Sequence, residues 1–388
     1  MTVPDVSVVI ALHNAMPDLT ACLTSLAGQT IGPARMEAVV VDDGSTDGSG
    51  AELARFATRH PGLFRTVRQE HSGGPAAVNR GTALARGRYL FHLGAGDRLG
   101  TESLERLVAA ADRWQSDVLI PRQVGGDDRQ SARGLFDRSR ESVTFTDSAL
   151  AWSLTDTKLF RREPVVRYGL RRREDLSVLS EQPYTLAALL HARKVSVLAD
   201  YDHHHPAPRA DRSAAAGPRL PERLRGIRAV QECLDALAPP GPVRDAVRAR
   251  SFGREVPQLL QTGWLAEPPA QQRRIAEEIA TLLDRHCPPG VFARLPVPDR
   301  LRLALAARGE LGALRALIAH EAANGAPPAV RRGGRAYAAY PGFRDRALGL
   351  PDALFELTDR PAPERPGPGR AGWRRAARLR RFAGAVRG

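Results

Sequence analysis

The first hundred residues alternate short apolar runs with amphipathic stretches. The run Val6–Ile10 is almost continuously apolar and rich in β-branched residues, which is typical of a strand covered on both faces. Apolar residues then recur at helical spacing, and the same succession of patterns repeats up to Tyr89. The alternation predicts a mostly parallel sheet with helices on both faces. The expected strands cover 6–10, 39–41 and 64–67 and begin again at 89, and the expected helices cover 19–26, 53–57 and 75–85.

The pattern changes after residue 100. Up to about Pro206 it is mixed, and a stretch rich in Pro, Ala and Ser then predicts a linker, "HPAPRADRSAAAGPRLP". Beyond the linker, apolar spacing predicts helices, two of them around 275–283 and 301–318. We therefore expect three parts. They are an α/β domain over residues 1–215, a mainly helical domain over 216–360, and a Pro/Gly linker with a basic tail over 361–388.

Charge and composition restrict the class of protein. The net charge is +14, and no apolar run is long enough to span a bilayer. Without a secretory signal, and with three widely spaced cysteines, the chain is expected in the cytoplasm with free thiols. The tail carries eight arginines against one glutamate, and Trp373–Val386 could form a basic amphipathic helix on an anionic membrane surface. A tail without a dedicated partner is the alternative, and nucleic-acid binding is disfavoured because interleaved aromatic residues are few.

Polar residues follow three of the predicted strands. The stretches are "ALHN", "VDDGSTDGS" and "GAGDRL". In an open α/β sheet, ligands bind beyond the carboxyl ends of the strands. A helix cap would explain Asp47 and Ser45, but it does not explain the adjacent acids Asp42 and Asp43 at a strand end. We therefore expect Asp43 to contact a ligand.

These blocks resemble a known family. "VSVVIALHN", "VVVDDGSTDGS", "HSGGPAAVNRG" and "ARGRYLFHLGAGDRL" are similar, in order and spacing, to the opening of the family 2 glycosyltransferases of GT-A fold. "TDTKLFRR" and "GLRRREDLSVLSEQPYTLAALL" most resemble the wall teichoic acid N-acetylglucosaminyltransferases and their actinobacterial relatives. The resemblance covers about residues 4–215. It implies inverting transfer of a sugar from a nucleotide-sugar donor, usually a UDP-sugar, to a hydroxyl of a glycan or polyol-phosphate acceptor of the cell envelope.

The resemblance also implies roles for individual residues. The catalytic base of the family, an Asp before a Gln, corresponds to Glu181 before Gln182. Asp43 would contact the uracil or ribose, and Arg209 lies where the family places a cation near the diphosphate. The expected donor-binding set is Ala11, Asn14, Asp43, His71, Arg80, Asp97 and Arg209.

The chain departs from the family at several of these positions. Ala11 replaces a proline, His71 an asparagine, and Val78 an arginine, although Arg80 is close. The Asp-x-Asp that would hold Mn²⁺ or Mg²⁺ reads Gly94-Ala95-Gly96, so a metal cofactor is doubtful. One compensation is a metal site built from Asp97 and His205, with His203 on the same face. The preferred alternative is that these histidines are solvated imidazoles at a polar strand end and bind no metal. A second compensation uses arginines, Arg80, Arg98 or Arg209, to neutralise the diphosphate without metal.

Two functions are consistent with the motif residues that the chain retains and those that it has replaced. The first is a glycosyltransferase that uses Glu181 as its base. The second is a catalytically degenerate relative that holds a nucleotide sugar, a glycan or a partner subunit. In either case the helical domain could serve assembly into a homo-oligomer.

Overall fold

The computed structural model describes residues 3–124, 134–207 and 220–357. Arg209, most of the predicted linker and the basic tail lie outside the described residues. The role of Arg209 near the diphosphate and the membrane binding of the tail therefore stay predictions.

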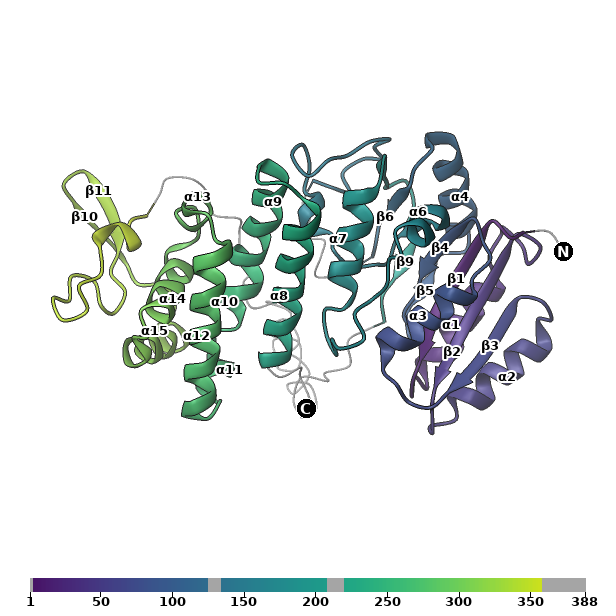
Figure 1. The fold of residues 1–388 in the computed structure, drawn as a ribbon, viewed down its shortest axis with the longest axis horizontal. Helices are drawn as coiled ribbons and strands as arrows, with labels where there is room; N and C mark the ends of the chain where they lie inside the picture. Colours follow the sequence, from purple (N-terminus) through teal and green to yellow (C-terminus); the bar gives the residue numbers. More distant parts are fainter. Residues whose placement is uncertain (1–2, 125–133, 208–219, 358–388) are drawn as a thin grey trace, which may run out of the picture.

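A seven-stranded mixed sheet forms the core of the first domain (Figure 1). Its strand order is β3-β2-β1-β4-β7-β6-β8, and every neighbouring pair is parallel except those that involve β7. The predicted, mostly parallel sheet is confirmed, and the antiparallel β7 is an addition that the sequence pattern did not indicate. The strands are β1 (Val6–Leu12), β2 (Met36–Asp43), β3 (Phe64–Gln69), β4 (Tyr89–His92), β6 (Val118–Pro121), β7 (Leu159–Arg161) and β8 (Val195–Leu198).

Helices cover both faces of the sheet, because successive strand residues point to opposite sides. Val8 and Val40 belong to one buried cluster with α1 (Asp18–Ala27), α2 (Ser49–Arg59) and α4 (Ser103–Trp114). Val9 and Val39 belong to a second cluster with α3 (Gly74–Leu84) and α7 (Glu181–His191). The predicted two-sided layering is confirmed. Helix α2 begins later than the Ser45–Asp47 cap would have placed it, with Gly48 at its N-cap.

Short elements complete the first domain. The two-stranded pair β5 (Arg98–Leu99) and β9 (His204–His205) joins the loop after β4 to the end of the domain. The 3-10 turn η1 (Leu150–Trp152) precedes β7, and α6 (Arg162–Arg167) follows it.

A helical domain follows, with a hydrophobic core of its own that includes the fully buried Trp264 and Phe252. In Figure 1 it lies to the left of the sheet, with a small β-hairpin at its far side. Helix α8 packs against α7, so the two domains share an interface. The expected single helix over 301–318 is two helices, separated at Gly309, whose φ is +70°. The elements are α8 (Leu220–Leu237), α9 (Pro242–Arg250), the π-helical turn η2 (Ser251–Glu255), α10 (Val256–Gln258), α11 (Thr262–Leu265), α12 (Pro269–His286), α13 (Pro289–Phe292), α14 (Val297–Ala307), α15 (Leu311–Asn324), β10 (Ala329–Arg332), β11 (Arg335–Ala338) and η3 (Asp352–Leu354).

Within the described residues, every helix is too short or too polar to cross a membrane. The described cysteines are unpaired; Cys22 is buried, and Cys233 and Cys287 are partly buried.

Candidate active site

The loops after β1, β2 and β3 are joined by hydrogen bonds at the carboxyl end of the sheet. The Asn14 N–H donates to Ser45 Oγ at 3.2 Å, and the Thr46 N–H donates to Asn14 Oδ1 at 2.8 Å. Asn14 adopts a left-handed backbone conformation with φ of 48°, which asparagine tolerates better than most residues. Asn14 therefore ties the first loop to the second, where the resemblance expects donor contacts.

Asp43 holds the loop after β3. Its carboxylate is 1% exposed and accepts hydrogen bonds from the Ser72 N–H at 2.8 Å, the Gly73 N–H at 2.9 Å and Gln69 Nε2 at 2.8 Å. Burial by itself raises the pKa of Asp43, but the hydrogen bonds from Ser72, Gln69 and Gly73 outweigh burial and lower it. Asp43 thus stays ionised and fixes the backbone of residues 72–73, and its contact with a nucleoside stays a prediction.

Two histidines lie beside this carboxylate. His71 Nδ1 is 3.0 Å from Asp43 Oδ2, and His13 Nδ1 is 2.8 Å from the Asp43 carbonyl oxygen. The two imidazole rings are 4.2 Å apart. Ligand atoms of His13, Asp43 and His71 lie within 4.8 Å of one another, a spacing that a metal ion could use. Because the Asp43 carboxylate already accepts two backbone N–H groups and an amide, a metal would have to displace existing partners.

The remaining expected donor residues surround this cluster. Arg80, on the exposed side of α3, donates through Nη1 to Gln69 Oε1 at 3.2 Å, and Gln69 in turn donates to Asp43. Ala11 lies in β1, opposite Val41 of β2, on the face that α3 covers. Val78 is buried on α3 and takes part in the same hydrophobic cluster. The structure therefore brings Arg80 to Asp43 through one bridging residue, and a donor contact of Ala11 stays a prediction.

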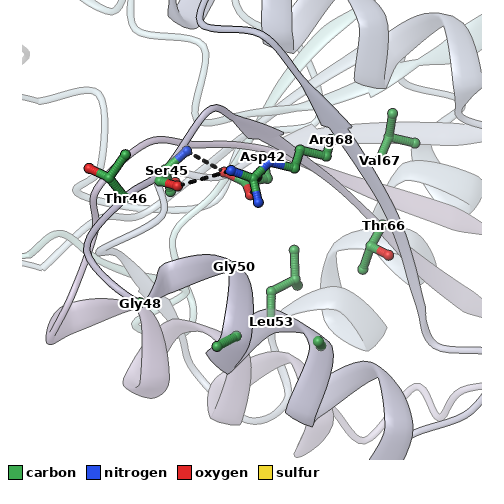
Figure 2. Close-up of a pocket in the computed structure, with 11 residues that line it drawn as sticks. Asp42, Ser45, Thr46, Gly48, Gly50, Leu53, Thr66, Val67 and Arg68 are labelled. Atoms are coloured by element: carbon green, nitrogen blue, oxygen red, sulfur yellow. Dashed lines mark hydrogen bonds and ion pairs between the residues drawn. The ribbon is translucent and has the colours of Figure 1, made fainter.

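A pocket of about 350 Å³ opens on the other face of the sheet, between β3 and α2 (Figure 2). Asp42 lines it because Asp42 and Asp43 are neighbours in a strand and point to opposite faces. The Ser45 N–H donates to Asp42 Oδ1 at 2.9 Å, and Arg68 Nε lies 3.9 Å from Asp42 Oδ2. The residues around Glu181 do not line this pocket. We place the candidate active site on the Asp43 side of the sheet, the side that helices α3 and α7 cover.

The turn over residues 94–97 does not have the composition of an Asp-x-Asp metal site. Asp97 is its one carboxylate, and it accepts hydrogen bonds from the Ala207 N–H at 2.9 Å and from His204 Nε2 at 3.0 Å. A Cβ added at Gly94 would lie 2.8 Å from Asp97 Oδ2, and one at Gly96 would lie 3.2 Å from Ala207 Cβ. The space in which the family's first metal carboxylate would begin is therefore taken by Asp97. The residues present do not fit the family's metal site.

The three histidines at the end of the domain lie differently from the favoured expectation. Solvated imidazoles were expected, but His203 is 0% exposed and His204 is 3% exposed. Burial is the main reason that the pKa of His203 is lowered to about 4. His204, rather than His205, contacts Asp97, because His204 pairs with Leu99 and His205 with Arg98 between β5 and β9. The pattern missed this burial because it depends on a strand pairing between segments about 100 residues apart.

Glu181 occupies the first position of helix α7. Burial is the largest influence on its carboxylate and raises the pKa, and Glu255 adds to this. The Glu181 N–H, Arg172 and Arg250 act in the opposite direction and favour the ionised form. The helix N-terminus also favours negative charge. A carboxylate with a raised pKa and several supporting positive charges has the properties of a general base.

A charged network that the sequence reading did not single out lies beside Glu181. The Arg172 side chain contacts the Asp156 carboxylate, which also receives His92 Nδ1 at 3.0 Å. Asn79 of α3 holds the Arg172 backbone, since its Oδ1 accepts the Arg172 N–H at 2.9 Å and its Nδ2 donates to the Arg172 carbonyl at 2.9 Å. Burial lowers the pKa of Arg172, which shows how strongly this guanidinium is desolvated. Both "TDTKLF" and "GLRRRED" belong to the resemblance, but only packing reveals that Asp156 and Arg172 meet.

Taken together, the mixed sheet and the loops gathered at its carboxyl edge define a GT-A nucleotide-sugar-binding fold. Comparison with solved structures supports that class. The structure of TarS 1–349 from S. aureus in complex with UDP-GlcNAc superposes with a TM-score of 0.73 at 20% identity, and the match covers 87% of this chain and 97% of that one.

Sequence comparisons then show which family models the two domains match. Residues 7–167 match the model of glycosyl transferase family 2, and residues 222–318 match the model of the glycosyl transferase TarS linker domain. The first domain therefore resembles glycosyl transferase family 2, and the helical domain resembles the TarS linker domain.

Two relatives are similar to part of the chain. The chain is 28% identical over 233 residues to a poly(ribitol-phosphate) beta-glucosyltransferase from Bacillus spizizenii, a match that covers 60% of this chain and 36% of the relative. It is 29% identical over 201 residues to the poly(ribitol-phosphate) beta-N-acetylglucosaminyltransferase TarS from Staphylococcus aureus, which covers 51% of this chain and 35% of TarS. The chain thus spans about a third of the length of these relatives.

Proposed function

We propose that this protein transfers a sugar, with inversion, from a UDP-sugar to a hydroxyl group of a polyol-phosphate polymer of the cell envelope, and that Glu181 is the general base. The observation that carries the proposal is the environment of Glu181. A partly buried carboxylate with a raised pKa stands at a helix N-terminus, in a chain that matches both the catalytic and the linker models of such enzymes.

The proposed reaction is a single displacement. The Glu181 carboxylate takes the proton of the acceptor hydroxyl while that oxygen forms a bond to the anomeric carbon of the donor sugar. The bond between the anomeric carbon and the phosphate oxygen breaks, and the nucleoside diphosphate leaves with the electron pair. The relatives are named as beta-glucosyl and beta-N-acetylglucosaminyl transferases. Because the corresponding UDP-sugars are α-linked, a β product requires inversion, for which one base is enough.

The negative charge of the leaving diphosphate must be neutralised. The 94–97 turn does not contain the family's two carboxylates that would bind a metal for this purpose. We propose that guanidinium groups neutralise part of this charge. Arg80 is exposed beside the Asp43 cluster, and Arg209 is the second candidate from the resemblance. The expected metal site of Asp97 and His205 is the weaker alternative, because His204 rather than His205 contacts Asp97.

The test is release of UDP from UDP-GlcNAc and from UDP-glucose in the presence of poly(ribitol phosphate). Wild type and Glu181→Gln are compared with and without EDTA. The proposal expects acceptor-dependent release that the Gln variant loses and that EDTA leaves unchanged. Release that is equal in wild type and Glu181→Gln would refute the assignment of the base, and loss of release in EDTA would favour a metal site.

The occupied 94–97 turn also favours a second function. The fold could bind a nucleotide sugar or a glycan without turning it over, since the carboxylates expected to hold the metal are absent from residues 94 and 96. Calorimetric binding of UDP-GlcNAc without release of UDP, under every acceptor tried, would support this binding role.

A further inference from the structure

Helix α8 of the second domain packs closely against the segment that precedes Glu181. Gly226 of α8 faces this segment so closely that an added Cβ would lie 2.8 Å from Leu179 Cβ and 3.1 Å from the Val178 carbonyl oxygen. Real side chains do not approach one another at such distances, so only glycine permits this contact. The helical domain therefore reaches the turn at residues 179–182 through the backbone of α8.

That turn is strained at the residue that α8 contacts. Leu179 has φ of +59°, in the left-handed region, which is unfavourable for an L-amino acid with a Cβ. The Gln182 N–H donates to the Leu179 carbonyl at 3.1 Å and closes the turn around Glu181. Such strain persists when the surroundings determine the conformation, and it is frequent at functional sites. Here the surroundings include a residue of the other domain.

The helical domain makes a second, polar contact on the other side of Glu181. Gln182, the residue after Glu181, donates through Nε2 to Glu255 Oε1 at 2.9 Å and accepts from Arg250 Nη1 at 3.3 Å. Arg250 and Glu255 form an ion pair at 3.0 Å, and both residues are 6% exposed. Both domains thus contribute to one buried polar cluster.

The ion pair depends on an irregular piece of helix. Arg250 ends α9, and Glu255 ends the π-helical turn η2. Gln231 of α8 fixes the start of this turn by donating to Ser251 Oγ at 3.0 Å. Single π-helical turns are rare and occur frequently at functional sites. A buried ion pair is weak evidence for a gain in stability, because well-packed apolar residues often serve as well.

We propose that Arg250 and Glu255, together with Gly226, position the Glu181 carboxylate, so that the helical domain is part of the catalytic unit. The proposal rests on the function proposed above. Arg250 and Glu255 act through Gln182 and through their charges, and they are positioning residues rather than catalytic ones.

The charges around Glu181 make the proposal testable. Arg172 faces it from the loop before α7, Arg250 from α9, and Glu255 from η2. Neutralising Glu255 leaves two guanidinium groups near Glu181, which favour its ionised form and should move the acid limb of the pH–rate profile to lower pH. Neutralising Arg250 removes a positive charge and should move the same limb to higher pH. A purely structural role for the ion pair predicts no such pair of opposite shifts.

The experiment uses the full chain and three variants. Glu255→Gln and Arg250→Met remove one partner each. Glu321→Gln is the matched control, because it breaks the pair of Glu321 with the buried Arg302 inside the same domain, away from Glu181. Release of UDP gives kcat, KM for the donor and the pH profile, and thermal unfolding gives stability. In parallel, ¹³C NMR of labelled glutamate, with the Glu181 signal assigned from Glu181→Gln, follows the titration of Glu181 without substrate.

The expected result is a fall in kcat of about 10–100-fold in Glu255→Gln and Arg250→Met, since a misplacement near 1 Å can cost that much. KM for the donor should change by less than about threefold, as the contact lies on the base side of the site. The pH limb and the NMR titration should shift in opposite directions in the two variants, and Glu321→Gln should leave all of these values unchanged.

Failure of this inference differs from failure of the proposed function. If wild type turns over, and the Glu255 and Arg250 variants lose only thermal stability with the Glu181 titration unmoved, the positioning role is overturned and the transferase stands. If wild type is silent with every donor and acceptor while the Glu181 titration still shifts in opposite directions, the positioning contact is supported and the transferase proposal fails.

Discussion

Two turns at the carboxyl edge of the same sheet differ in what they retain. The turn at residues 94–97 consists of small residues and one carboxylate, which is engaged by His204 and by the Ala207 N–H. The turn at residues 179–182 keeps a partly buried carboxylate, a left-handed Leu179 and a polar contact with the other domain. The first turn is relaxed and satisfied, whereas the second is strained and charged.

The difference between the two turns favours the turn around Glu181, rather than the turn at residues 94–97, as the place where functional groups are retained. Burying a charge and straining a backbone both cost stability, and such features persist only where the structure over-determines them. On the base side the helical domain supplies that support. On the metal side the corresponding carboxylates are absent and protein groups occupy the space. The carboxylate proposed as the base is thus present, whereas the turn expected to hold a metal is closed by internal hydrogen bonds.

The largest expected effect comes from removing the carboxylate of Glu181, the proposed base. Glu181→Gln should lower kcat by about 10²–10⁴-fold, while calorimetric affinity for UDP-GlcNAc should stay within about threefold. In wild type, kcat should rise with pH through an ionisation above 4.5, the ordinary value for a glutamate. A Glu181→Gln variant that keeps more than half of the wild-type kcat would contradict the role of Glu181 as general base.

The same substitution should change stability in a direction that the pKa shift determines. Because the pKa of Glu181 is raised in the folded state, folding is favoured at acid pH, and this contribution is lost as pH rises through the folded-state pKa. Glu181→Gln should therefore unfold at a higher temperature than wild type near pH 8, with the difference shrinking toward pH 4. Scanning calorimetry at several pH values measures it.

The next largest effect concerns Asp43, which orders the donor side. In Asp43→Asn an amide NH₂ must face a backbone N–H that the carboxylate now accepts, so the free energy of unfolding should fall by about 2–3 kcal/mol. The pKa of Asp43 is lowered, so its contribution is present above 3.8 and lost as pH falls through the folded-state value. Urea unfolding at pH 7 and pH 3 measures this. Asp47→Asn, at an exposed position of the same motif, is the control and should cost less.

Placing a carboxylate at position 94 tests whether the turn at residues 94–97 can hold a metal. In Gly94→Asp the new Cβ would clash with the Asp97 carboxylate, and the added charge repels it. We expect a loss of about 1–3 kcal/mol in unfolding free energy and no gain of manganese affinity by calorimetry. Gly290→Asp is the matched control, because a Cβ there meets nothing within 4 Å. Manganese-dependent release of UDP in Gly94→Asp would instead show that the turn can still serve a metal.

The smallest effect is expected from freeing Asp97. His204→Gln removes the imidazole that donates to Asp97, which should cost about 1 kcal/mol in unfolding free energy and leave manganese affinity unmeasurable. His320→Gln, in the helical domain, is the control. Tight manganese binding by His204→Gln would mean that Asp97 can serve as a metal ligand once His204 is removed. The 94–97 turn would then retain a metal-binding function.

Much of the first domain could be predicted from local patterns. The strands at Val6–Leu12 and Met36–Asp43, the amphipathic helices between them and the two-sided layering follow from residue spacing alone. The antiparallel β7 was missed because three residues carry too little periodicity. The break at Gly309 was missed because the apolar spacing continues across it.

The sequence by itself determined the succession of elements, the motifs at the strand ends and the absence of carboxylates at positions 94 and 96. These are properties of neighbouring residues, and local periodicity and chemistry are enough to read them. Only the tertiary structure decided which groups surround Glu181, that His203 and His204 are buried, and that Asp97 is already engaged. Those features depend on contacts between segments about 70 to 110 residues apart, and burial and charge at such contacts arise only when the chain has folded.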